Sequence, residues 1–146
     1  MLSSADIRAP ALRRLYDDWQ ARRRGREFPA RGDFDAPDLK YVLGNIAMFD
    51  VAYDPLRFRF RLHGSRIAQR VGYDMTGKDF EEMPAPGLRQ EMRRHFTTVL
   101  ETRAPRVEIR AREVGAEGVI DCEVLVLPLS RDGATIDILM VGVWFP

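Results

Sequence analysis

The two strands predicted near the C-terminus are apolar on both faces, and this limits the chain to few architectures. Successive side chains of a strand point to opposite faces. In residues 119–130, Val124 and Val126 share one face, while Leu125 and Leu127 share the other; residues 135–145 repeat this pattern. A sheet that is apolar on both faces needs cover on both. We expect helices from the middle of the chain over one face, and an N-terminal helix, a partner chain, or both over the other.

An amphipathic helix is predicted near the N-terminus. Residues 9–24 read APALRRLYDDWQARRR, and their apolar side chains recur at helical spacing. The stripe consists of Leu12, Leu15, Tyr16 and Trp19. Arginines gather at the C-terminal end of this segment, where positive charge suits the helix dipole. Because the stripe must pack on something, we predict a homodimer in which these four residues form the interface.

The order of the other predicted elements indicates an α+β fold with an antiparallel sheet. Strands at 45–53 and 57–63 form a hairpin around Asp54 and Pro55. A short helix follows Gly64 and ends near Gly72, and a longer one runs from 86 to 102. Strands at 106–114, 119–130 and 135–145 are joined by short turns and form a meander. We divide the chain into a helix and capping segment, 1–44, and a sheet domain, 45–146, that form one globular unit.

The second strand reads Arg-Phe-Arg-Phe-Arg-Leu-His over residues 57–63, a strict alternation. It predicts an arginine face, paired with neighbours or in solvent, and a Phe/Leu face toward a core or pocket. His63 falls on the polar face in this interpretation. Apolar side chains on the following helices could complete a small-molecule pocket, or they could simply fill the core. The pocket candidates are Phe60, Leu62, Ile67, Val71, Tyr73 and Phe96.

Composition and charge argue against several classes of function, although a nucleic-acid binder stays a third hypothesis. The net charge is +1, from 23 basic and 22 acidic residues, so there is no general field to attract nucleic acid. The arginine stripe also lacks the aromatic neighbours on which single strands stack. The single cysteine, Cys122, excludes an internal disulfide. With no secretory signal pattern and no apolar run long enough to span a bilayer, we expect a cytoplasmic protein.

No catalytic or metal-binding motif stands out. His63 and His95 lie outside any nucleophile motif, and the apolar surroundings of Cys122 favour a buried structural role. The aspartate-rich segment 32–38 lacks the glycine and glutamate of a calcium loop, so no metal is expected. A small-molecule enzyme is the alternative. It would need a buried acid or base, for which the candidates are Asp50, Asp121 and Glu123. The simpler interpretation is that each of these carboxylates pairs with an arginine.

The element order and the segments RLHGSRIA and VGYDMTG together resemble the PAS domain family. The fold of that family is a five-stranded antiparallel sheet with small helices between its second and third strands. The segment GSRIAQRVGYDMTGKDFEEM stands at that insertion. More narrowly, residues 12–145 are similar to stand-alone PAS-like proteins of alphaproteobacteria, with the N-terminal pattern LRRLYDDWQARRRGREFPARGDFDAPDL carrying much of the likeness.

The resemblance implies a sensory or regulatory protein and not an enzyme. We expect it to act by protein association, with or without control by a small organic ligand. Since the sequence shows no kinase, cyclase or DNA-binding segment, we expect the output to come through a protein partner, whose identity is unknown. Flavin is not supported, since the Asn-Cys-Arg-Phe segment of the family's photoreceptors is absent. Haem is not supported either, because the neighbours of His95 match no haem-binding pattern of the family.

Overall fold

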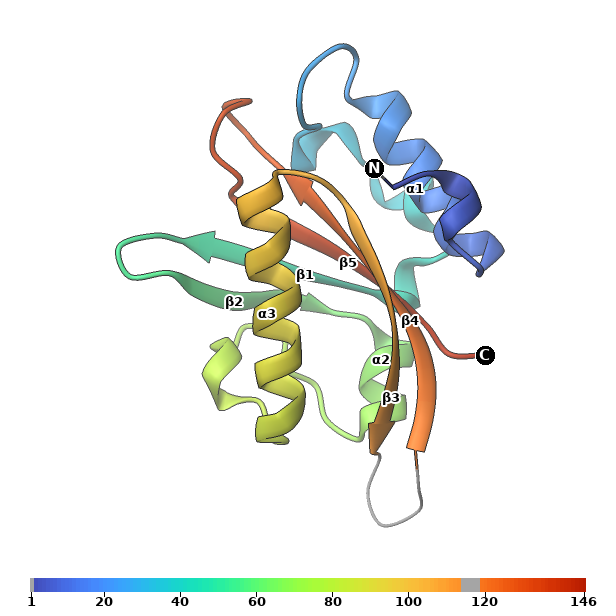
Figure 1. Ribbon diagram of the computed structural model, residues 1–146, viewed down its shortest axis with the longest axis vertical. Coiled ribbons are helices and arrows are strands. Elements are labelled where there is room, and N and C mark those ends of the chain that lie inside the picture. The colour runs from blue at the N-terminus through green and yellow to red at the C-terminus, as the bar shows by residue number, and fades with distance from the viewer. Residues whose placement is uncertain (1, 114–118) are drawn as a thin grey trace.

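The computed structural model describes the backbone of residues 2–113 and 119–146, and the side chains of residues 2–110 and 122–146. Its centre is a five-stranded antiparallel sheet in the order β2-β1-β5-β4-β3 (Figure 1). The strands are β1 (Ile46–Ala52), β2 (Arg57–His63), β3 (Arg106–Glu113), β4 (Val119–Leu129) and β5 (Ile138–Trp144). The predicted α+β fold and C-terminal meander are confirmed, although the predicted turn at residues 115–118 lies outside the described residues.

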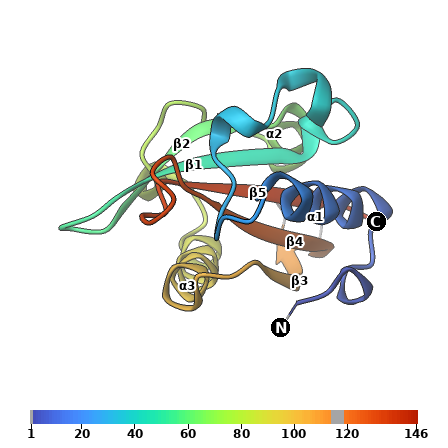
Figure 2. The same cartoon turned by 90° about the horizontal axis from the view of Figure 1, so that it is seen from above.

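Three helices accompany the sheet: α1 (Pro10–Arg22), α2 (Ser65–Val71) and α3 (Pro86–Thr102) (Figure 2). The chain also forms short 3-10 helices before α1, between α1 and β1, and between α2 and α3. These are η1 (Ser4–Asp6), η2 (Arg31–Asp33), η3 (Ala36–Leu39), η4 (Leu43–Asn45) and η5 (Phe80–Glu82). Helices α2 and α3 follow β2 in the chain and cover the face that we call the inner face. The outer face of β4 and β5 is covered by α1, so both apolar faces of the sheet are buried.

The stripe of α1 packs on the chain's own sheet. Leu12 and Leu15 lie against Gly142 of β5, where a Cβ atom would come within 2.6 Å of Leu12 Cδ2. Trp19 is 1% exposed and donates a hydrogen bond from Nε1 to the Pro128 carbonyl at 2.8 Å. All four residues of the stripe are buried within the chain. They are therefore not available as a dimer interface, which corrects that prediction.

A buried carboxylate fixes the start of α1. Glu123 of β4 is 5% exposed, and its two oxygens accept hydrogen bonds from the backbone N–H groups of Arg8 and Ala9, both at 2.8 Å. Charge-assisted bonds of this kind are among the stronger ones in proteins. This residue, predicted to pair with an arginine or to act as a buried acid, instead anchors α1 on the outer face.

The pairing of β1 with β2 contains an irregularity that reverses the faces of β2. Phe49 lies opposite Phe60, but the preceding Met48 lies opposite Leu62, so Arg61 is an extra residue in β2. Such a β-bulge shifts the alternation by one position. Beyond it, His63 joins Phe60 on the buried inner face, whereas Leu62 turns to the outer face and is half-buried. The predicted faces of both residues are therefore wrong.

Helix α2 begins where two backbone segments approach closely. A Cβ atom on Gly64 would lie 2.4 Å from the Gly44 carbonyl oxygen and 2.6 Å from that of Ile46. No side chain fits there, so only glycine can follow the end of β2 without a steric clash. The helix ends at Gly72, whose φ of 92° is the left-handed conformation that glycine tolerates best. These two glycines therefore mark the beginning and the end of α2, which packs against η4.

Candidate functional site: a small apolar cavity and its polar surroundings

A small cavity lies between the inner face of the sheet and the helices that cover it. Measured as the space open to the centre of a water molecule, it is about 20 Å³, which is room for about one water. Its wall is almost entirely apolar. The lining residues are Ala47, Phe49, Phe60, His63, Ile67, Val71, Tyr73, Met83, Leu88, Met92, Val124, Val141 and Val143. A flavin or haem needs a volume of the order of several hundred Å³, so the residues present do not fit either group.

Four of the six predicted pocket residues line this cavity: Phe60, Ile67, Val71 and Tyr73. Leu62 does not, because the bulge at Arg61 turns it to the outer face. Phe96 does not either. It is fully buried in a cluster of aromatic rings, with its centroid 4.8 Å from that of Phe49 and 5.2 Å from that of Phe58. Ligand binding by the four lining residues stays a prediction.

His63 lines the cavity, although the sequence predicted it on the polar face of its strand. Its ring lies 5.2 Å from the Phe60 ring, and its Nδ1 accepts a hydrogen bond of 2.9 Å from the Met75 N–H. Its own backbone N–H donates to Thr76 Oγ1 at 3.0 Å. Since Nδ1 is an acceptor, the neutral imidazole carries its proton on Nε2. His63 therefore ties the segment after α2 to the wall of the cavity.

The segment after α2 is also paired with the edge of β2. The Phe60 N–H donates to the Lys78 carbonyl at 2.9 Å, and the Gly77 N–H donates to the Phe60 carbonyl at 2.7 Å. Just before them, the Thr76 backbone and hydroxyl both donate to Asp74, which lowers the pKa of that carboxyl. Residues 73–79 are thus hydrogen-bonded along the edge of β2, and Tyr73 at their start lines the cavity.

Two methionines line the cavity. Met83 comes from the loop before α3, and Met92 comes from α3 itself. Methionine is unbranched and flexible, and it adapts readily to irregular space. Both side chains are buried. A cavity with such walls can enlarge by rotation of side chains, without a change in the fold.

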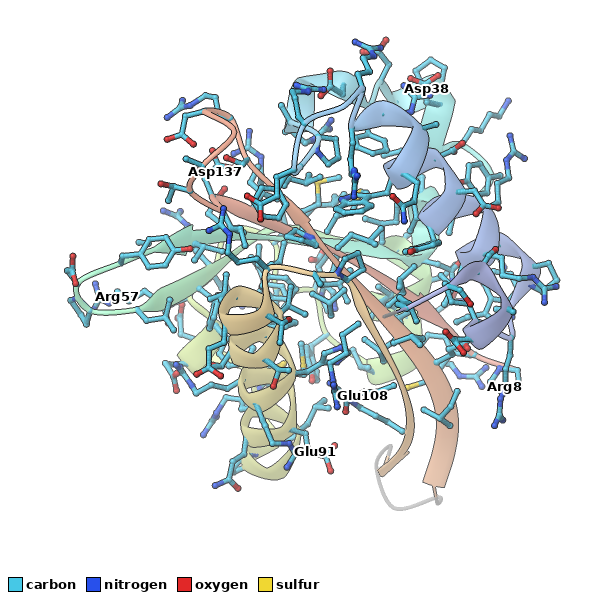
Figure 3. The ribbon with its side chains drawn as sticks, turned by 45° about the horizontal axis from the view of Figure 1, so that its top comes forward. Arg8, Asp38, Arg57, Glu91, Glu108 and Asp137 are labelled. Atoms are coloured by element: carbon cyan, nitrogen blue, oxygen red, sulfur yellow. The ribbon has the colours of Figure 1, made fainter. Side chains whose placement is uncertain are left out.

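A buried polar cluster lies beside the cavity, between α3 and β3 (Figure 3 labels Glu108 of this cluster). His95 of α3 has no exposed surface, and its Nδ1 lies 2.6 Å from Arg110 Nη2 and 3.3 Å from Glu108 Oε2. Its Nε2 lies 3.1 Å from the Arg106 carbonyl oxygen. Val124, which lines the cavity, is paired directly with Glu108 in the sheet.

The cluster holds His95 in its neutral form. Burial, followed by the nearby Arg110 guanidinium, lowers the pKa of His95 to about 4. A neutral ring with its proton on Nε2 can donate to the Arg106 carbonyl and accept from Arg110 at Nδ1, which agrees with both distances. Burial raises the pKa of Glu108, but a hydrogen bond from Arg106 and the positive charges of the neighbouring guanidinium groups lower it below its usual value. The cluster is therefore a carboxylate–arginine network around a neutral imidazole.

The carboxylates considered for catalysis lie elsewhere. Asp50 is partly exposed and pairs with Arg61 at 3.1 Å, and Glu123 binds the start of α1 on the outer face. The side chain of Asp121 lies outside the described residues. Cys122 is buried, as predicted. Among the residues with described side chains, no group of three His, Cys, Asp or Glu could hold a metal ion.

Comparison with known proteins agrees with this architecture. A family model described as a PAS domain matches residues 7–143. No curated protein matches the chain. No helix in the described part of the chain is long and apolar enough to cross a membrane.

Several solved structures share the fold. A light-oxygen-voltage domain studied with a flavin analogue has a TM-score of 0.56 at 10% identity, over 75% of this chain and 82% of that one. A sensory box sensor histidine kinase from Vibrio cholerae has a TM-score of 0.52 at 21% identity, over 74% and 88%. The LOV protein of Rhodobacter sphaeroides has a TM-score of 0.53 at 10% identity, over 77% and 68%. These similarities concern the fold alone. With the family match over almost the whole chain, they lead to one conclusion: the chain belongs to the PAS domain family.

Proposed function

We propose that this PAS domain is a regulatory module that detects a small apolar molecule in the cavity beneath α2 and answers by changing its association with another protein. A sensory or regulatory role follows from the family and fold. The observation that carries the ligand proposal is the cavity itself, which is apolar, closed by a short helix and lined by two flexible methionines.

Helix α2 is the element best suited to respond to a ligand. It has seven residues, of which only Ile67 is fully buried, and a helix of this length is not stable without packing. Both Ile67 and Val71 line the cavity. A molecule larger than water would displace lining side chains, and these two are among them. The position of α2 therefore depends on what the cavity contains.

The first turn of α2 packs against η4, and this contact connects α2 with the protein surface. Gly64 and Arg66 lie against Gly44, so α2 and η4 are packed directly on each other. In η4, Leu43 is 39% exposed, one of the large apolar side chains on the described surface. Movement of α2 would shift this surface, which supports an output through a protein partner. A cytoplasmic homodimer stays a prediction from the sequence, and its interface is unassigned.

Native mass spectrometry of protein purified from cells, compared with the denatured mass, tests the ligand proposal. We expect an excess native mass that disappears on denaturation. The variant Ala47→Val adds two methyl groups to a cavity that has room for about one water, so it should lose the excess. Met48→Leu changes the neighbouring residue on the opposite face and is the matched control. Equal native and denatured chain masses for the wild-type protein would refute the proposal.

A further inference from the structure

A second hollow lies on the other side of α2, facing away from the apolar cavity. It measures about 570 Å³ by the same definition, within the range of about 300–1,000 Å³ typical of small-molecule sites. Its wall combines guanidinium, carboxamide and aromatic groups and contains no carboxylate. The lining residues are Asn45, Arg66, Gln69, Arg70, Trp144 and Phe145.

No carboxylate with a described side chain neutralises the positive charge of this hollow. Arg66 and Arg70 are four residues apart on α2, so both project from one face of the helix. Neither forms an ion pair with a carboxylate among the residues whose side chains are described. Like charges at this spacing destabilise a helix. An anion between the two guanidinium groups would remove that cost.

Several contacts hold the wall of the hollow in place. The stem of Arg66 runs over Gly44, where a Cβ atom would meet Arg66 Cγ at 3.1 Å. The Arg70 guanidinium lies 5.0 Å from the centre of the Phe145 ring. Asn45 is 7% exposed and donates from Nδ2 to the Val143 carbonyl at 2.9 Å, which fixes the strand end that carries Trp144. The basic groups of α2 and the aromatic groups at the end of β5 therefore line one common space.

We propose that this hollow binds a small organic anion, with a carboxylate or phosphate group between Arg66 and Arg70 and a flat ring against Trp144. Guanidinium groups bind both kinds of anion through paired hydrogen bonds. Aromatic side chains favour offset or edge contact with a flat partner. This site is distinct from the apolar cavity, although Ile67 and Val71 of the same helix line that cavity.

Titration of the full chain with 1-naphthyl phosphate and with 1-naphthoate tests the proposal and separates the two anion types. The chain has two tryptophans, and their indole N–H signals give separate NMR readouts. Trp19 is 1% exposed and bonded to the Pro128 carbonyl, so its signal is an internal control. We expect the Trp144 signal to shift to saturation with at least one probe while that of Trp19 stays in place.

Charge variants show whether the two arginines carry the binding. The double variant Arg66→Gln/Arg70→Gln should weaken the affinity at least about tenfold, which corresponds to the loss of one charged contact. Arg57→Gln removes an exposed arginine at the far end of the β1–β2 hairpin (Figure 3) and should change the affinity less than about twofold. Absence of a Trp144 shift with both probes at millimolar concentration would overturn the proposal. Equal weakening in the Arg57 variant would do the same. Neither result bears on the apolar cavity, which lies across α2.

Discussion

Acid should destabilise this fold through His95. The pKa of His95 is lowered to about 4 in the folded protein, against about 6.5 for an unfolded chain. Between these values the unfolded state binds more protons, so the free energy of unfolding falls as the pH drops through this window. One pKa unit corresponds to about 1.4 kcal/mol, so lowering the pH from about 7.5 to 4.5 should cost about 2–3 kcal/mol.

Urea denaturation at a series of pH values measures this loss, and His95→Gln isolates it. Glutamine can still donate to the Arg106 carbonyl and accept from Arg110, but it does not titrate. The pKa of Glu108 is lowered as well, so its own contribution is lost at lower pH, as the carboxyl protonates, in both proteins. We expect the variant to be less stable at neutral pH and to show a flatter pH dependence. Parallel curves for the two proteins would refute the assignment of His95 as a buried neutral base.

Further predictions concern the two elements that cover the sheet. Glu123→Gln replaces one of two carboxylate acceptors by a donor that faces a backbone N–H, and should lower the free energy of unfolding in urea by about 2–3 kcal/mol; a change below about 0.5 kcal/mol would contradict this anchor. Gly64→Ala places a Cβ atom 2.4 and 2.6 Å from two backbone carbonyl oxygens and should cost about 1–3 kcal/mol or more in thermal unfolding. Gly32→Ala, with nothing within 4 Å of the added atom, is its control and should be nearly neutral; equal effects of the two would contradict the close approach.

The fold could be predicted because it depends on patterns that extend over many residues. Strands apolar on both faces required two covering layers, and the α1 stripe at helical spacing supplied one of them. The stripe did not specify the surface that it would cover. Gly142 makes β5 a suitable surface for this helix, because a residue without a side chain leaves room for Leu12 and Leu15. A glycine within an apolar strand was the available signal, and it was not used.

The details of the candidate site could not be predicted, because they depend on single residues and on pairs distant in sequence. The bulge at Arg61 leaves no mark in a strictly alternating segment, yet it exchanges the faces of Leu62 and His63. The pairing of His95 with Arg110 depends on how α3 lies on β3, which no local pattern specifies. Sequence patterns therefore located the cavity but misplaced its polar wall.

Methionine methyl NMR can show whether the apolar cavity accepts a small molecule. The chain should be titrated with small apolar probes, from isopropanol to indole. Met83 and Met92 line the cavity, while Met48 and Met140 are buried on the outer face and serve as internal controls. Of these four signals, we expect only those of Met83 and Met92 to show saturable shifts. No shift with any probe, or equal shifts of all four signals, would contradict it and indicate a filled core.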